Sequence, residues 1–296
     1  MGTKKETVGK NRLRAVLMNL VWIPVAANLA GHWTGCHPLT VASKPLLMPL
    51  LALTAYLLMT GCGVRGAGRT KIVAALLFGA LGDILLMFSG TWWFLAGMLA
   101  FLAGHVLYYL TLPSPFRLTV PSGPGVFAGT VPPSGEVASP AGDGDKCRRS
   151  PQRKVLSLLL LAGLLACVVY VAGLFPAEGA MKVAVTVYAC AFAFLIHASV
   201  VAIFTASCTS RPATAVDIPG VPRKASPAAL SSPALYLLTA VGFIVFAVSD
   251  AFVAIGAFTE AAIPRRGFIV MSTYIFAQMA VSLSLSLQEI KKTGKI

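Results

Sequence analysis

The sequence predicts an all-α polytopic membrane protein, a bundle of eight transmembrane helices with both termini in the cytosol. Of the 296 residues, 57% are hydrophobic and only 11% are charged, whereas a soluble domain holds about 25% charged residues. The mean hydropathy is +0.80. The apolar residues gather in runs long enough to cross a bilayer, which takes about 17 to 25 residues per helix, and most basic residues lie between those runs.

Eight apolar runs are expected to form the helices. The first follows a basic N-terminal stretch and shows no convincing small-residue cleavage site, so we interpret it as a retained helix. The third and fourth are separated by only a few residues and should form an antiparallel hairpin, with Trp92 and Trp93 at the membrane interface. The predicted helices are 14–31, 43–61, 71–89, 91–112, 154–175, 180–206, 233–258 and 267–288.

The basic residues predict the orientation. With the N-terminus in the cytosol, all but four of the 24 Lys and Arg residues fall on the cytosolic side, as the positive-inside rule requires. The four on the opposite side are Lys44, Lys182, Arg265 and Arg266. The net charge of +14 is therefore explained by topology, and because the basic residues form no face interleaved with aromatics, no nucleic-acid partner is expected.

The segments between the helices complete the domain organisation. Helices one to four span 14–112, five and six span 154–206, and seven and eight span 233–288, with basic cytosolic tails at 1–13 and 289–296. Two cytosolic loops, 113–153 and 207–232, are rich in Pro, Gly, Ser and Ala and are expected to be disordered. The six cysteines form no CxxC pair, which argues against a disulfide framework or a zinc ribbon.

Two acidic residues stand apart from the other eight. Asp83 in LGDILLMF and Asp250 in FAVSDAFV lie well inside apolar runs, where an ionised side chain costs about 2.5–3.5 kcal/mol. Both helices run outward from the cytosol and place these carboxyls in the non-cytosolic half, so we expect them to share one cavity. There, one carboxyl can stay protonated and donate while the other stays ionised and accepts. The structural alternative is that each only hydrogen-bonds across the bundle.

Other polar residues fall within the predicted helices. Tyr188 lies on the sixth helix, and Tyr274 and Gln278 share one face of the eighth at i, i+4 spacing. His105 lies deeper on the fourth helix than the aspartates and does not obviously reach them. Tyr108 follows about one turn later, and spacing alone slightly favours a polar pair that hydrogen-bonds between helices.

Six segments in order along the chain resemble motifs of one known family. They are SKPLLMPLL from Ser43, FGALGDILLMF, FLAGMLAFLAGHVLYYL, VTVYACAF, VGFIVFAVSDAFVAIGAF and STYIFAQMAVSLSL. Together they resemble the YhhN family of membrane proteins, the lysoplasmalogenases. The two long cytosolic loops depart from the family pattern but do not interrupt any of these segments.

The resemblance implies hydrolysis of the vinyl ether bond of a lysoplasmalogen, which yields a fatty aldehyde and glycerophosphoethanolamine or glycerophosphocholine. It implies Asp83 and Asp250 as the catalytic acid–base pair. Further residues are implied as lining the substrate site: Lys44, His105, Tyr108, Tyr188, Tyr274 and Gln278. The expected partners are a lysophospholipid substrate and membrane lipid, and neither a metal nor another cofactor is expected to be needed.

Three other functions remain open from the sequence. A proton- or cation-coupled transporter could use the same aspartate pair. A metal-dependent lipid hydrolase would need several histidines at one depth, and a non-catalytic lipid-binding protein would use the aspartates for stability or partner binding. The long low-complexity loops suggest a eukaryotic chain and hence the endomembrane system, with the endoplasmic reticulum expected. No pattern in the sequence indicates the oligomeric state.

Overall fold

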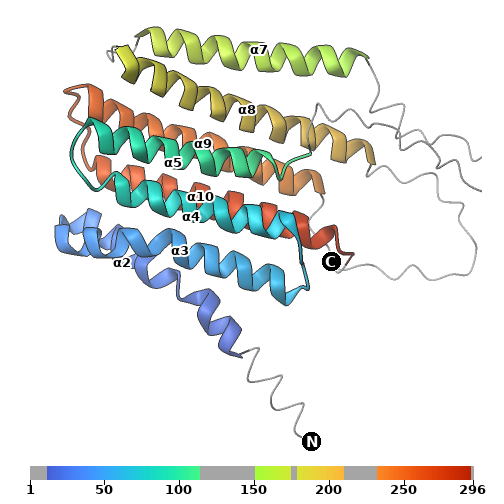
Figure 1. The fold of residues 1–296 in the computed structure, drawn as a ribbon, viewed down its shortest axis with the longest axis horizontal. Helices are drawn as coiled ribbons and strands as arrows, with labels where there is room; N and C mark the ends of the chain where they lie inside the picture. The colour runs from blue at the N-terminus through green and yellow to red at the C-terminus, as the bar shows by residue number, and fades with distance from the viewer. Residues whose placement is uncertain (1–11, 114–150, 175–178, 210–231, 295–296) are drawn as a thin grey trace, which may run out of the picture.

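The computed structural model describes residues 12–113, 151–174, 179–209 and 232–294, and these residues form an all-helical bundle (Figure 1). A short helical stretch at 12–19 precedes α2 and belongs to the same span. The prediction of an all-α fold is thus confirmed for the described part of the chain. The labelled helices are α2 (Trp22–Thr34), α3 (His37–Gly61), α4 (Ala67–Leu85), α5 (Thr91–Tyr109), α7 (Pro151–Leu174), α8 (Gly179–Thr209), α9 (Ser232–Phe258) and α10 (Arg266–Lys291).

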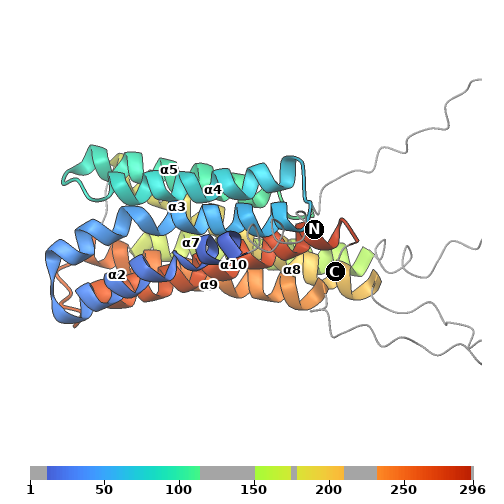
Figure 2. The same ribbon diagram turned by 90° about the horizontal axis from the view of Figure 1, so that it is seen from below.

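The helices lie along one common axis (Figures 1 and 2). Helix α10 is central, since it packs against α9, α2, α3 and α4, while α5 packs between α4 and α8. The beginning of the first described span and the end of α10 point toward the same end of the bundle. This arrangement agrees with an even number of crossings; that this end faces the cytosol stays a prediction.

Seven spans in the described residues are long and apolar enough to cross a membrane. Large apolar side chains are exposed along the bundle, from Trp22 on α2 to Phe276 on α10, as expected of helices surrounded by lipid. The protein is therefore a multi-pass integral membrane protein. Helix α4, the third predicted span, is not among these seven and is more polar because it contains Arg69, Lys71 and Asp83. Its 19 residues extend over about 28 Å, which is enough to cross the hydrocarbon layer.

Several helix boundaries differ from those predicted. Helix α3 begins at His37 rather than at residue 43, with Pro38 in its first turn, where a missing N–H is tolerated. Helix α4 covers Ala67–Leu85 rather than 71–89, and α5 ends at Tyr109 rather than 112. Hydropathy marks where the chain meets the bilayer, whereas helical hydrogen bonding can continue into the interface or stop before it.

The ends of the two loops predicted to be disordered, where the structure describes them, belong to helices. Helix α7 begins at Pro151, α8 continues to Thr209 and α9 begins at Ser232, so these ends of the loops are helical. The remainder of both predictions, 114–150 and 210–231, lies outside the described residues. The added residues extend the start of α7 and the end of α8 beyond their predicted apolar runs.

Glycines bring α4 and α5 into close contact. A Cβ on Gly104 would lie 3.0 Å from the backbone oxygen of Ala75, and one on Gly97 would lie 2.9 Å from the side chain of Leu86. Small residues let membrane helices approach closely, because packing rather than water exclusion drives their association. The close α4–α5 contact fixes the position of Gly82 and therefore of Asp83, the next residue.

Replacing Gly104 by Val should destabilise the bundle by about 1–3 kcal/mol, because the new side chain must push α5 away from the α4 backbone. The matched control is Gly163→Val on α7, where an added Cβ meets no atom within 4 Å. Thermal unfolding of both variants in detergent, followed by loss of the monodisperse peak on size-exclusion chromatography, measures the difference. Equal midpoints for the two variants would contradict the close α4–α5 packing.

Candidate functional site

A cavity of about 350 Å³ lies inside the helical bundle. Residues from seven helices line it, from α3 to α10, with α2 outside the lining. Most of the lining is aliphatic or aromatic. The polar exceptions are Lys44, Asp83, Tyr188, Ser249, Asp250 and Tyr274. Asp83 and Asp250 therefore line one cavity, as their matching depths in the sequence suggest.

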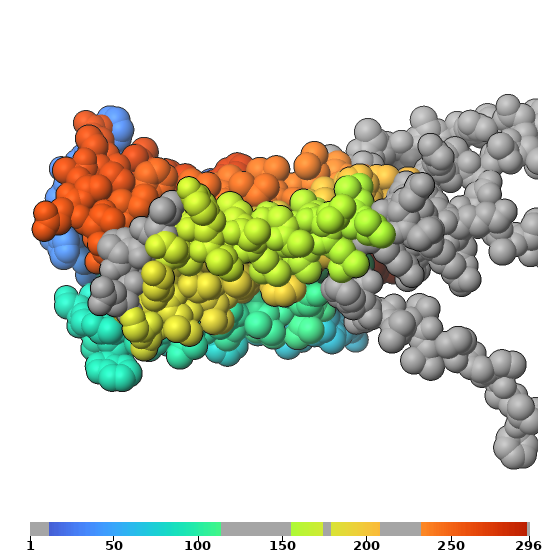
Figure 3. Space-filling model, turned by 90° about the horizontal axis from the view of Figure 1, so that it is seen from above, coloured from blue at the N-terminus to red at the C-terminus, as the bar shows by residue number. Residues whose placement is uncertain are grey.

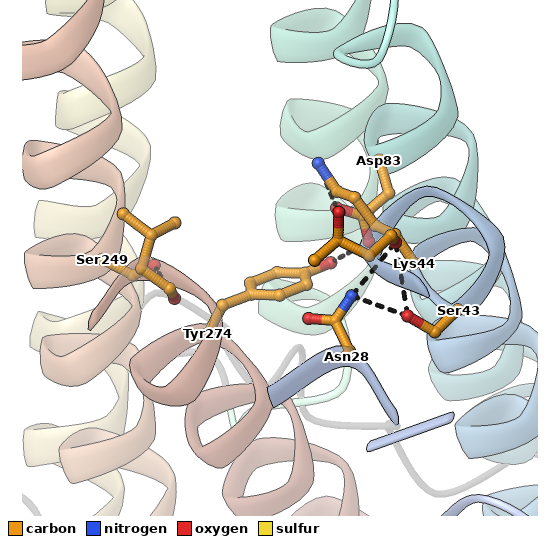
Figure 4. A network of polar contacts seen from close by, with 8 residues as sticks. Asn28, Ser43, Lys44, Asp83, Ser249 and Tyr274 are labelled. Atoms are coloured by element: carbon orange, nitrogen blue, oxygen red, sulfur yellow. Dashed lines mark hydrogen bonds and ion pairs between the residues drawn. The ribbon is translucent and has the colours of Figure 1, made fainter. Parts of the chain in front are cut away.

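Asp83 is buried near the end of α4, and two groups face its carboxyl (Figure 4). The hydroxyl of Tyr274, from α10, donates a hydrogen bond of 2.7 Å to Oδ2. The Nζ of Lys44, from α3, lies 3.8 Å from Oδ1. A buried carboxylate is stabilised when a charge partner and a hydrogen bond replace its water shell. Three helices thus combine to hold this carboxyl inside the bundle.

Asp250 on α9 has a different environment. The hydroxyl of Tyr188, from α8, donates a hydrogen bond of 2.5 Å to its Oδ2. Within the described part of the chain, no cation forms an ion pair with it. Asp250 lines the same cavity as Asp83. Among the described residues, the Asp83 carboxyl therefore has the Lys44 ammonium nearby, whereas the Asp250 carboxyl has the Tyr188 hydroxyl.

Two interhelical hydrogen bonds near this site were not predicted from the sequence. Ser249 Oγ donates to the backbone oxygen of Val270 at 3.0 Å, which ties α9 to α10 beside Asp250. Asn28 Nδ2 donates to Ser43 Oγ at 3.0 Å, which ties α2 to α3 next to Lys44 (Figure 4). Both bonds start from a polar side chain isolated in an apolar run. Such side chains commonly hydrogen-bond between membrane helices, and this pattern could have indicated the two bonds.

Three of the expected site residues do not line the cavity. Tyr108 donates a buried hydrogen bond of 3.0 Å to Gln278 Oε1, so this pair joins α5 to α10. His105 is also buried, and neither of its ring nitrogens has a hydrogen-bond partner among the described residues. Its ring packs against the rings of Tyr188 and Phe192, with centroids 5.3 and 4.5 Å away. His105 and Tyr108 were expected to hydrogen-bond between helices; among the described residues, Tyr108 does so and His105 does not.

His105 is thus connected to the site through packing. It contacts the ring of Tyr188, whose hydroxyl holds Asp250. Lys44, Tyr188 and Tyr274, by contrast, reach the cavity directly. Across the described residues, no three His, Cys, Asp or Glu side chains lie together so as to hold a metal ion. The chemistry available to the cavity from these side chains is proton transfer and charge stabilisation.

A comparison with protein families matches the chain to the YhhN family over residues 39–132 and 146–285. The matched ranges include all six polar residues that line the cavity. The interruption falls inside 113–153, the longer of the two loops that depart from the family pattern. Comparisons with curated proteins and with solved structures give no match.

Proposed function

The chain belongs to the YhhN family, and on this basis we propose that it is an integral-membrane lysoplasmalogenase. It would hydrolyse the vinyl ether bond of a lysoplasmalogen to a fatty aldehyde and glycerophosphoethanolamine or glycerophosphocholine. Membership of the family is consistent with such a hydrolase. The observation that carries the proposal is that Asp83 and Asp250, from separate helices, line a single cavity whose wall is otherwise largely apolar.

The two carboxyls have complementary roles in the proposed reaction. One carboxylic acid donates its proton to the alkene carbon remote from the ether oxygen, which leaves an oxocarbenium ion. The other, as a carboxylate, stabilises this cation and takes a proton from the water that adds to the carbon bonded to oxygen. The hemiacetal then releases the glycerol hydroxyl and the aldehyde. Paired carboxylates serve similar transition states in glycoside hydrolysis.

The surroundings of the two aspartates suggest which role each takes. Lys44 offsets the charge of Asp83, so we assign Asp83 as the carboxylate and Asp250 as the proton donor. Lys44 also lines the cavity, where its ammonium can meet the substrate phosphate as a point charge. Tyr188 and Tyr274 hold the carboxyls in place through their hydroxyls.

Aldehyde release by the purified full-length protein in detergent tests the proposed reaction. We expect release from vinyl-ether lysolipids and none from saturated alkyl-ether lysolipids, because only the vinyl ether forms an oxocarbenium ion on protonation. A vinyl-ether glycerol without phosphate should react with a higher KM, because it lacks the group that meets Lys44. Activity should survive chelators.

The main rival is a proton- or cation-coupled transporter that uses the same carboxyls. Reconstituted vesicles that take up solute when a pH gradient is imposed, with no aldehyde from any vinyl ether, would favour that rival and overturn the enzymatic proposal. We also propose that the protein resides in the endoplasmic reticulum. Co-fractionation of the full-length chain with membranes of that compartment tests this location.

A further inference from the structure

The cavity has a polar side and an apolar side. The polar side chains come from α3, α4, α8, α9 and α10, and none comes from α7 or α5. Helix α7 contributes a stripe with i, i+3, i+4, i+7 and i+8 spacing, which is one face of a helix. The stripe consists of Leu164, Cys167, Val168, Val171 and Ala172.

Helix α7 is also the outermost helix of the bundle. It packs against α8 (Figures 1 and 3), and no residue of its span Val155–Gly173 is buried in the structure. Val169 and Tyr170 do not line the cavity and are 64% and 69% exposed. One face of α7 therefore lines the cavity while another faces the bilayer. Among the described residues, α7 thus forms part of the cavity wall with an exposed apolar face behind it.

We propose that this face of α7, with the facing parts of α8 and α9, binds the hydrocarbon chain of a single-chain lipid. The inference rests on the proposed function and deepens it, because it fixes the direction in which the substrate lies. The phosphate is then at Lys44, the reacting bond at Asp83 and Asp250, and the chain beside α7. A hydrocarbon chain that leaves the bilayer must stay in apolar surroundings, because exposing its methylenes to water is unfavourable, so an apolar wall continuous with the carboxyl pair suits a long chain.

The position of α7 also gives the chain a route. Lysolipid substrates reside in the bilayer, which lies on the outer face of α7. The fatty aldehyde left after hydrolysis is apolar and returns to the same phase. Helix α7 packs mainly against α8. A lipid chain can therefore pass between the bilayer and the cavity when α7 moves, without separation of the other helices.

Two valines on α7 provide a matched test. Val171 lines the cavity and Val169 does not. Val171→Trp should lower kcat/KM about tenfold or more for long-chain substrates and much less for short-chain ones, because lost apolar contacts in a pocket are worth about 10- to 200-fold. Val169→Trp should retain the chain-length profile of the unaltered protein. Identical profiles for the two variants, together with aldehyde release, would overturn the chain site.

Labelling of Cys167 gives a second readout that does not depend on turnover. Cys167 is free and exposed and lines the cavity, whereas Cys36, at the start of α3, is free and exposed but does not. A saturated alkyl-ether lysolipid, which cannot be hydrolysed, should slow maleimide labelling of Cys167 several-fold and leave Cys36 unchanged, with each site resolved by peptide mass spectrometry.

The two readouts separate failure of the inference from failure of the proposed function. Protection of Cys167 without aldehyde release from any substrate supports the chain site and removes the lysoplasmalogenase proposal. Aldehyde release without protection of Cys167, or with equal slowing at Cys36, counts against the chain site while leaving the reaction in place.

Discussion

Asp83→Asn and Asp250→Asn are each expected to abolish aldehyde release, with kcat lower by about 10²–10⁴-fold. Asparagine keeps the shape of the side chain but can neither deliver a proton to the alkene nor accept one from water. Since the two carboxyls act on one substrate in one cavity, the double variant should be little worse than either single variant. Initial rates of aldehyde formation with saturating vinyl-ether lysolipid measure the loss.

The aspartate variants need evidence that the fold and substrate binding persist. Asn at position 83 can still accept the Tyr274 hydroxyl through its amide oxygen, so the α4–α10 link is retained. Slowed labelling of Cys167 by the alkyl-ether lysolipid should therefore remain in both variants. Full activity of either variant with that protection intact would remove the aspartate pair from the mechanism.

The sequence predicted the aspartate site because of the energetics of the bilayer. A carboxyl in an apolar run must face protein or a cavity, and a fixed rise per residue allows depths on different helices to be compared. Those two facts are enough to predict that Asp83 and Asp250 share one cavity, as they do in the folded bundle. Depth along the axis is the coordinate that a helical sequence supplies directly.

The sequence does not predict in the same way how each helix is rotated about its axis, and therefore which side chains face the cavity. Tyr274 and Gln278 share a face of α10, yet only Tyr274 reaches the cavity, while Gln278 bonds Tyr108. His105 lies against Tyr188 without bonding to it through either nitrogen, a result that depends on the tilt and separation of α5 and α8. These contacts depend on how neighbouring helices pack, which the spacing of residues on one helix does not predict.

The role of α7 was hidden for a related reason. Its run is apolar on every side, so no periodic change in polarity distinguishes the cavity face from the bilayer face. Val169 and Val171 are the same residue type two positions apart, and of the two Val171 lines the cavity. The contact between Asn28 and Ser43 was likewise missed because it depends on how α2 crosses α3.

The two tyrosines at the carboxyls are expected to differ in importance. Tyr188→Phe removes the one side-chain hydrogen bond that Asp250 receives from the described residues, whereas Tyr274→Phe leaves Asp83 with Lys44 nearby. A side-chain hydrogen bond contributes about 0.5–3 kcal/mol, with the larger values for charged partners, which corresponds to roughly 2- to 150-fold in rate. Because Asp250 loses the hydroxyl that holds it whereas Asp83 keeps Lys44 nearby, Tyr188→Phe should lower the rate more than Tyr274→Phe within that range.

A comparison of kcat and KM shows whether these phenols act through the carboxyls. If they orient Asp83 and Asp250, both substitutions lower kcat, while KM and the chain-length profile stay near those of the unaltered protein. Tyr170→Phe, on the exposed face of α7, is the matched control and should leave both parameters unchanged. Equal losses in the two variants would argue against the asymmetry that Lys44 introduces. A rise in KM alone would instead place the tyrosines in substrate binding, leaving the carboxyls to be oriented by their own helices.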